Sequence, residues 1–80
     1  MCFVYLLRSL SSTTQKYIGL ANDPDRRLLQ HNRGENRSTA RYRPWEIVVV
    51  IRFKNSERAA AFEQYLKSGS GWSFANRHLW

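Results

Sequence analysis

The chain has 80 residues, enough for one small domain (residues 1–80) with a modest core. Its 13 lysines and arginines against 6 acidic residues give a formal net charge of +7, which favours a nucleic-acid partner over a membrane surface. The single cysteine, Cys2, excludes an intrachain disulfide and a cysteine-based zinc site, and no signal peptide or run of about 18 apolar residues is seen, so we expect a cytoplasmic protein.

The first two elements are predicted to be strands of an antiparallel hairpin. Residues 3–7 are a continuous apolar run rich in β-branched and aromatic side chains, which indicates a strand buried on both faces. A polar turn region at 9–14 separates it from a returning strand at 16–19. Eleven residues separate Tyr5 from Tyr17, so both tyrosines can project to one face of the hairpin, depending on its register.

A helix is predicted next, from about Pro24 to Asn32. Asp23 is suited to its N-cap and Pro24 to its first position. Gly34 follows the predicted end and is suited to the left-handed conformation that ends many helices.

This helix presents two kinds of side chain. Arg27 and His31 are four residues apart and therefore share one face. Leu28 and Leu29 point elsewhere and are expected to face the core. The strand, turn and helix thus present a tyrosine, a fixed cation and an imidazole. The alternative is a surface ion-pairing arginine beside a core tyrosine.

Residues 33–44 are expected to form a polar, arginine-rich loop. Four arginines stand here against one glutamate, with Ser, Thr, Asn and Tyr between them. Such a loop is suited to contact a phosphate backbone, and the alternative is a solvated basic loop. The predicted nucleic-acid-binding residues are Lys16, Arg33, Arg37, Arg41 and Arg43.

The remaining chain predicts a strand and two helices. Residues 45–53 contain five consecutive isoleucines and valines, which suggests a strand covered on both sides. A helix is expected from Asn55 or Ser56 to about Lys67, and a shorter one over 72–79 after a break at two glycines. The order is strand, strand, helix, strand, helix, helix. It predicts an α/β (α+β) fold with a three-stranded, largely antiparallel sheet flanked by helices.

Glu63 lies at the edge of an apolar stripe on the second long helix, beside Phe62 and Leu66. A carboxylate at such a position is costly unless it is paired, hydrogen-bonded or bound to a cation. One interpretation is a stripe-edge glutamate that reaches water or an arginine. The other is a ligand of magnesium, which takes one or two protein oxygens and keeps most of its waters.

The candidate site residues supply most of the groups that a phosphodiesterase needs: Tyr5, Tyr17, Arg27, His31 and Glu63. Arg27 is suited to stabilise charge on a phosphate, and a metal on Glu63 to act as a Lewis acid. A base must activate water, and His31 has a suitable ordinary pKa of about 6.5. A tyrosine could serve instead if a neighbouring positive charge lowered its pKa from about 10.

The same ordered set resembles the GIY-YIG endonuclease domain over nearly the whole chain. The resemblance rests on Val4-Tyr5, Tyr17-Ile18-Gly19 after eleven residues, Arg27-x-x-x-His31 and Glu63. It implies cleavage of a DNA phosphodiester with Mg²⁺ or Mn²⁺, leaving a 5′-phosphate and a 3′-hydroxyl. It further implies that Tyr5 and Tyr17 are the paired tyrosines. Arg27 would be the phosphate-contacting arginine and Glu63 the single metal ligand. Of these residues Tyr5 is our choice of general base, with Tyr17 and His31 orienting water or relaying the proton.

Two features depart from the family pattern. Phe3 occupies the position of the first motif's glycine. The family often has an asparagine after the metal-binding glutamate, and the candidate here is Asn76, thirteen residues after Glu63. Asn76 is alternatively a solvated helix residue. Two rival functions remain, a nucleic-acid-binding module without cleavage and a protein-interaction domain that reuses the fold. The resemblance suggests DNA repair or recombination, with a protein partner that supplies specificity.

Overall fold

Three strands form one antiparallel sheet in the computed structural model, which describes residues 2–80. The strands are β1 (Cys2–Ser9), β2 (Lys16–Ala21) and β3 (Trp45–Phe53). Their order is β2-β1-β3, so β1 is central and pairs with both neighbours. The prediction that the first strand is buried on both faces is confirmed.

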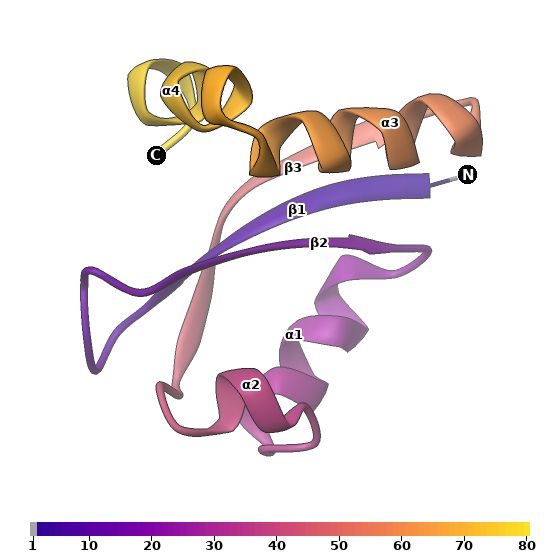
Figure 1. Ribbon diagram of the computed structural model, residues 1–80. Helices are drawn as coiled ribbons and strands as arrows, with labels where there is room; N and C mark the ends of the chain where they lie inside the picture. The colour runs from indigo at the N-terminus through magenta and orange to yellow at the C-terminus, as the bar shows by residue number, and fades with distance from the viewer. Residues whose placement is uncertain (1) are drawn as a thin grey trace.

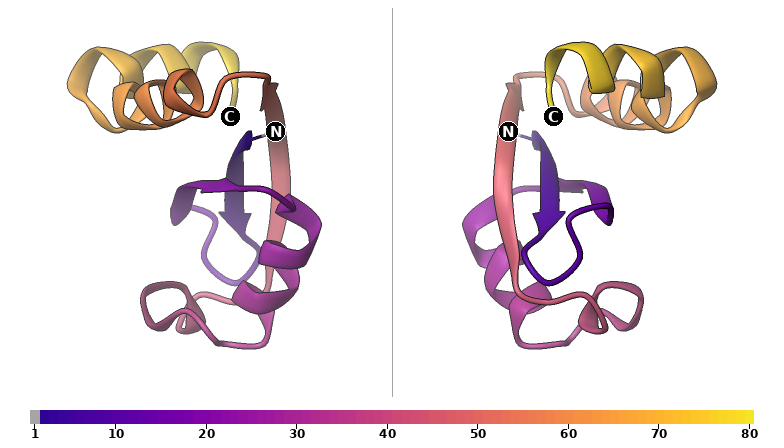
Figure 2. Two further views of the ribbon diagram at one scale, coloured as in Figure 1. Left: turned by 90° about the vertical axis from the view of Figure 1, so that its right-hand side faces the viewer. Right: turned by 90° about the vertical axis from the view of Figure 1, so that its left-hand side faces the viewer.

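Four helices are described for residues 2–80, and they cover the sheet from two sides (Figures 1 and 2). On one side lie α1 (Pro24–Asn32) and α2 (Arg37–Ala40), and on the other α3 (Ser56–Lys67) and α4 (Gly69–His78). None of these four helices has the length and apolar content needed to cross a lipid bilayer. The predicted α+β architecture is confirmed.

The starts of the first two predicted helices agree with the side-chain caps. Asp23 accepts a hydrogen bond from the Arg26 amide at 3.1 Å, so α1 begins as expected. Asn55 caps α3 by accepting from the amides of Glu57 and Arg58. Gly34 follows α1 with a positive φ of 82°, a conformation that favours glycine.

Four expectations about local structure were wrong. The last helix does not start at residue 72 after a break at two glycines, because Ser68 caps α4, which begins at Gly69 and contains Gly71. The arginine-rich segment is not all loop, because α2 forms there with Asn36 as its N-cap. The strand β3 is not covered on both sides, since it lies at the sheet edge and Val50 is 43% exposed. Leu29 does not face the core and is 56% exposed, whereas Leu28 packs toward the sheet.

The alternation of β1 divides the core into two clusters, because successive side chains of a strand point to opposite faces. Val4 and Leu6 pack with Ile18 and with residues of α3 and α4. Tyr5 and Leu7 pack on the other face with Trp45, which is 4% exposed. One strand therefore supplies both an aliphatic core and a face that carries a tyrosine.

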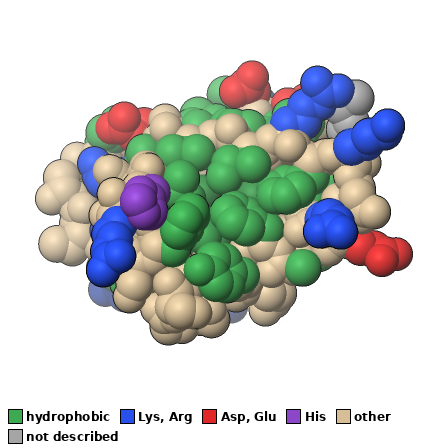
Figure 3. Space-filling model, turned by 90° about the horizontal axis from the view of Figure 1, so that it is seen from above, with side chains coloured by type: hydrophobic (Ala, Val, Ile, Leu, Met, Phe, Trp, Pro, Cys, Tyr) green, Lys and Arg blue, Asp and Glu red, His purple; other side chains and the backbone are tan. Residues whose placement is uncertain are grey.

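Hydrophobic side chains gather on the outer surface of α3 and α4 (Figure 3). Ring contacts connect Phe62 to Tyr65 at 6.1 Å, Tyr65 to Phe74 at 6.2 Å and Phe74 to His78 at 5.0 Å between ring centroids. Tyr65 and Phe74 are 41% and 37% exposed. This surface faces away from α1 and α2.

Candidate active site

Two tyrosines and a histidine meet on the α1 side of the sheet. Tyr5 pairs with Gly19 across the β1–β2 ladder and Tyr17 pairs with Leu7, so both tyrosines point to the same face. The Tyr5 and Tyr17 ring centroids are 6.1 Å apart, and Tyr17 meets the His31 ring edge-on at 4.8 Å. The predicted common face of the two tyrosines is confirmed.

His31 is held by a hydroxyl at each ring nitrogen. Its Nε2 lies 3.0 Å from the Tyr5 hydroxyl, and its Nδ1 lies 2.7 Å from Oγ1 of Thr39 on α2. The exposed fractions of Tyr5, His31 and Thr39 are 1%, 0% and 2%. The imidazole is therefore buried with both nitrogens satisfied.

Burial sets the protonation of this cluster. Burial raises the pKa of the Tyr5 hydroxyl above its ordinary value of 10, an effect that nearby Arg27 partly offsets and that Tyr17 reinforces. Burial, together with the charge of Arg27, lowers the pKa of His31 below its ordinary value of 6.5. At neutral pH the pair is thus a protonated phenol beside a neutral imidazole.

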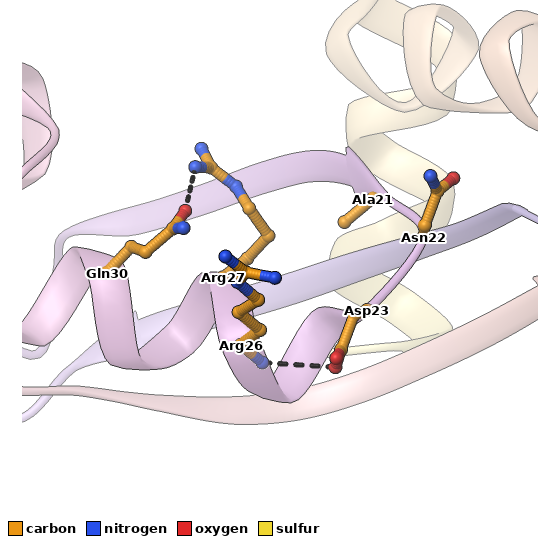
Figure 4. Close-up of a pocket in the computed structure, with 6 residues that line it drawn as sticks. All are labelled: Ala21, Asn22, Asp23, Arg26, Arg27 and Gln30. Atoms are coloured by element: carbon orange, nitrogen blue, oxygen red, sulfur yellow. Dashed lines mark hydrogen bonds between the residues drawn. The ribbon is translucent and has the colours of Figure 1, made fainter.

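Arg27 lies at an open cavity and is also close to Tyr5 of this cluster. The cavity holds about 260 Å³ and is lined by residues of the β2–α1 turn and of α1 (Figure 4). Arg27 donates a hydrogen bond to Gln30 within it. A fixed guanidinium between a buried tyrosine and an open cavity is suited to bind an anion such as a phosphate.

Gly19 allows the Tyr5 ring to pack closely against the backbone of β2. A Cβ atom at this position would lie 2.5 Å from the Tyr5 hydroxyl oxygen, so only glycine leaves room for the ring. The side chain of Tyr5 therefore lies against the backbone of β2. The sequence interpretation placed Gly19 in a strand and in the Tyr17-Ile18-Gly19 motif and did not foresee this packing.

Glu63 lies in the opposite layer, on α3, and is not part of the tyrosine–histidine cluster. Glu63 is 8% exposed, and its carboxylate contacts the Lys67 ammonium at 2.5 Å. Among residues 2–80, no group of three or more His, Cys, Asp and Glu side chains could hold a metal ion. Glu63 is thus paired with Lys67 in this structure, and its carboxylate oxygens are of the kind that Mg²⁺ takes when water supplies the other ligands.

The predicted basic residues are divided between two regions. Lys16 reaches the α4 side, where its ammonium donates to the Asn76 side-chain oxygen at 3.2 Å and lies over the rings of Trp72 and Trp80. Asn76 thus contacts Lys16. The other predicted residues are exposed around α2, on the tyrosine side: Arg33, Arg37, Arg41 and Arg43.

Three residues that support the site were missed by the sequence interpretation. Thr39 contacts His31, and Gln30 accepts a hydrogen bond from Arg27. Asn32 holds the start of β3, because its side chain accepts from the Trp45 amide at 2.6 Å and donates to the Trp45 carbonyl oxygen at 3.2 Å. The i, i+3 spacing of Arg27 and Gln30 was readable in the sequence. The contacts of Thr39 and Asn32 join separate elements and left no local signal.

Comparison with known proteins identifies the family. The family model described as the GIY-YIG catalytic domain matches residues 1–72. The SLX1 homolog of Giardia intestinalis, a structure-specific endonuclease subunit, is 33% identical over 95% of this chain and 21% of its own length. The structure-specific endonuclease subunits slx1 of Aspergillus oryzae and Aspergillus niger are 48% and 42% identical, over 70% and 92% of this chain. The chain spans about a fifth or less of the length of these relatives.

Proposed function

Because this chain belongs to the family of GIY-YIG catalytic domains, we propose that it is an endonuclease that hydrolyses DNA phosphodiester bonds. The observation that carries the proposal is the cluster of Tyr5, Tyr17 and His31 beside Arg27 at an open cavity. These groups supply a proton acceptor and a fixed positive charge, as hydrolysis of a phosphodiester requires.

In the proposed reaction, water attacks phosphorus in line with the leaving 3′ oxygen. The new bond joins the water oxygen to phosphorus, the bond from phosphorus to the 3′ oxygen breaks, and solvent protonates that oxygen. The products are a 5′-phosphate and a 3′-hydroxyl. Arg27 stabilises the charge that builds on the phosphate oxygens.

The proton of the attacking water passes through Tyr5. Its raised pKa makes loss of the phenolic proton unfavourable before the reaction. His31 Nε2 accepts that proton as the Tyr5 oxygen takes one from water, so no free phenolate has to form. Tyr17 borders both rings and is assigned to orient the water.

We assign Glu63 as the holder of a divalent cation, Mg²⁺ or Mn²⁺. The support is its buried carboxylate, whose present partner Lys67 is 48% exposed and can move into solvent. When bound, the cation supplies Lewis-acid stabilisation of developing negative charge.

The proposed substrate is branched DNA, bound with the help of a protein partner. The named relatives are structure-specific endonuclease subunits, and the net charge of +7 suits a polyanion. Four exposed arginines lie around α2, which supports their proposed role as phosphate contacts. DNA repair or recombination is the process this activity would serve. A cytoplasmic, reducing setting is supported by the single buried thiol, Cys2.

Cleavage of a labelled panel tests the proposal. The panel holds duplex, flap, junction and single-stranded DNA together with RNA, each with Mg²⁺ or with EDTA. We expect magnesium-dependent cuts in branched DNA, lost in Glu63→Gln. Retarded bands without cuts would contradict the nuclease assignment and favour a binding module, and absence of binding at low salt would favour a protein-interaction domain.

A further inference from the structure

The hydrogen bonds of His31 indicate which of its two ring nitrogens carries the hydrogen. Thr39 has one hydroxyl hydrogen, and Oγ1 of Thr39 donates it to the Asn36 carbonyl oxygen at 3.3 Å. With its hydrogen on Asn36, Oγ1 accepts at its 2.7 Å contact with His31 Nδ1, and this assignment makes Nδ1 the protonated ring nitrogen. Nε2 then carries a lone pair and accepts from the Tyr5 hydroxyl at 3.0 Å.

We propose that Thr39 is a positioning residue that fixes this tautomer of His31, so that Nε2 is free to take the proton of Tyr5 during phosphodiester cleavage. The inference rests on the proposed nuclease function and adds a residue to it. The opposite tautomer would place a proton on Nε2, and Tyr5 would then have no acceptor.

The fate of each proton is balanced. As Tyr5 transfers its hydrogen to Nε2 it gains one from water, so His31 becomes an imidazolium while the phenol is restored. The imidazolium keeps its Nδ1 hydrogen on Thr39. After the product leaves, it returns the Nε2 proton to water by way of the Tyr5 hydroxyl, in the reverse of the first transfer. Thr39 accepts a hydrogen bond in both states and never touches the substrate.

The electrostatic surroundings of His31 agree with a neutral starting state. The titratable and charged groups that face it are Tyr5 from β1, Tyr17 from β2 and Arg27 from α1, and the group from α2 is the uncharged Thr39. Since no carboxylate is among them, the ring is not stabilised as an imidazolium before the reaction.

The backbone of Thr39 is held independently of its side chain. Its carbonyl oxygen accepts from Nε1 of Trp45 at 2.9 Å, and Asn36 caps the short helix α2 around it. A change limited to the hydroxyl should therefore leave α2 in place. This makes Thr39→Val a suitable probe, because valine has nearly the same shape without an acceptor.

The test compares Thr39→Val and Thr39→Ser in the full chain. For Thr39→Val we expect kcat on the cleaved DNA to fall roughly 10- to 100-fold, the range usual for groups that orient a functional histidine, with KM little changed. The acid limb of the kcat–pH profile should move to lower pH, because an imidazolium without its Nδ1 acceptor is harder to form. Thr39→Ser keeps the hydroxyl and should restore both.

A second readout is independent of activity. The chain has two histidines, so ¹⁵N NMR of histidine-labelled His78→Gln protein reports on His31 alone. We expect Nδ1 to give a protonated signal and Nε2 an unprotonated one at neutral pH, and Thr39→Val to shift the proton toward Nε2.

The outcomes separate this inference from the nuclease assignment. If the parent protein cuts DNA and Thr39→Val matches it in kcat and pH profile, the role of Thr39 is overturned while the proposed function stands. An Nε2-protonated His31 in the parent protein would also overturn it, whether or not DNA is cut. If the parent protein cuts nothing, the proposed function fails, and the NMR spectra alone decide the tautomer assignment.

Discussion

The two faces of strand β1 are equally buried and built from different chemistry. Tyr5 faces α1 and is hydrogen-bonded to His31, whereas Val4 and Leu6 face α3 at 0% exposure among aliphatic and aromatic neighbours. Burying the polar groups of the first face costs free energy unless each finds a partner. The second face gains free energy simply by leaving water.

Hydrogen bonding offsets that cost on the tyrosine face. Within residues 2–80, the only buried side-chain nitrogen or oxygen without a partner is Nε1 of Trp80, which packs on the aliphatic side. We therefore expect the aliphatic face to contribute mainly to stability and the polar face mainly to the proposed cleavage. Substitutions on the two faces should therefore separate activity from stability.

The largest effect is expected from Tyr5→Phe. Cleavage should fall about 100- to 10,000-fold, because the proton acceptor of the attacking water is removed. Stability should fall by only about 1–3 kcal/mol, since the His31 acceptor loses its donor. The exposed Tyr65 on α3 provides the control, and Tyr65→Phe should leave both quantities unchanged. Cleavage above a tenth of the parent rate in Tyr5→Phe would remove Tyr5 from the reaction.

On the aliphatic face, Leu6→Ala should show the reverse pattern. Truncating a fully buried leucine destabilises a domain by about 2–5 kcal/mol, which urea unfolding would measure. The rate per folded molecule should stay near the parent value. Leu10→Ala, at a 55% exposed position, is the control and should change stability by less than about 0.5 kcal/mol. A large loss of rate per folded molecule in Leu6→Ala would show that the faces are not separable.

A substitution at Gly19 should affect both quantities. The Cβ of Gly19→Ala would displace the Tyr5 ring, with a stability loss of about 1–3 kcal/mol and slower cleavage. Gly69→Ala is the matched control, because its Cβ would meet nothing within 4 Å. Equal behaviour of the two variants in melting and cleavage assays would contradict the close packing of Tyr5 on β2.

The smallest effect is a pH dependence of stability. The pKa of His31 is lowered in the folded protein, so below about pH 6.5 the unfolded chain binds more protons and stability falls as pH falls. One such group gives at most about 1.4 kcal/mol for each pH unit. Urea unfolding between pH 5 and 7 should show a flatter slope in His31→Asn and an unchanged slope in His78→Gln. An unchanged slope in His31→Asn would contradict the buried neutral imidazole.

The sequence predicted the elements that have strong local signals and missed those that depend on contacts between elements. The apolar run of β1 and the cap at Asp23 were readable, and the period of two allowed Tyr5 and Tyr17 to share a face. The position of β3 at the edge of the sheet could not be predicted, because a run of valines does not show which strands pair with it. The four-residue helix α2 has no apolar periodicity, so Thr39 was hidden in a polar segment.

The candidate site was predicted in its composition and less well in its layout. Tyr5, Tyr17, Arg27 and His31 lie together as expected, since a hairpin and the helix after it carry them. Glu63 comes from the layer on the opposite side of the sheet, which no helical wheel of α3 could reveal. Its assignment as a metal ligand stays a prediction.

The most direct test of the catalytic role proposed for the tyrosine face compares two neighbouring arginines. Arg26 and Arg27 both line the cavity (Figure 4). Arg27 partly offsets the raised pKa of Tyr5, whereas Arg26 is exposed. Arg27→Ala and Arg26→Ala change the net charge equally, so a cleavage assay at fixed ionic strength isolates position from charge. We expect Arg27→Ala to lose cleavage by about 100-fold or more and Arg26→Ala to stay within a few-fold of the parent. Equal losses in both variants would mean that only bulk charge matters, and would contradict a catalytic cluster built on Tyr5, His31 and Arg27.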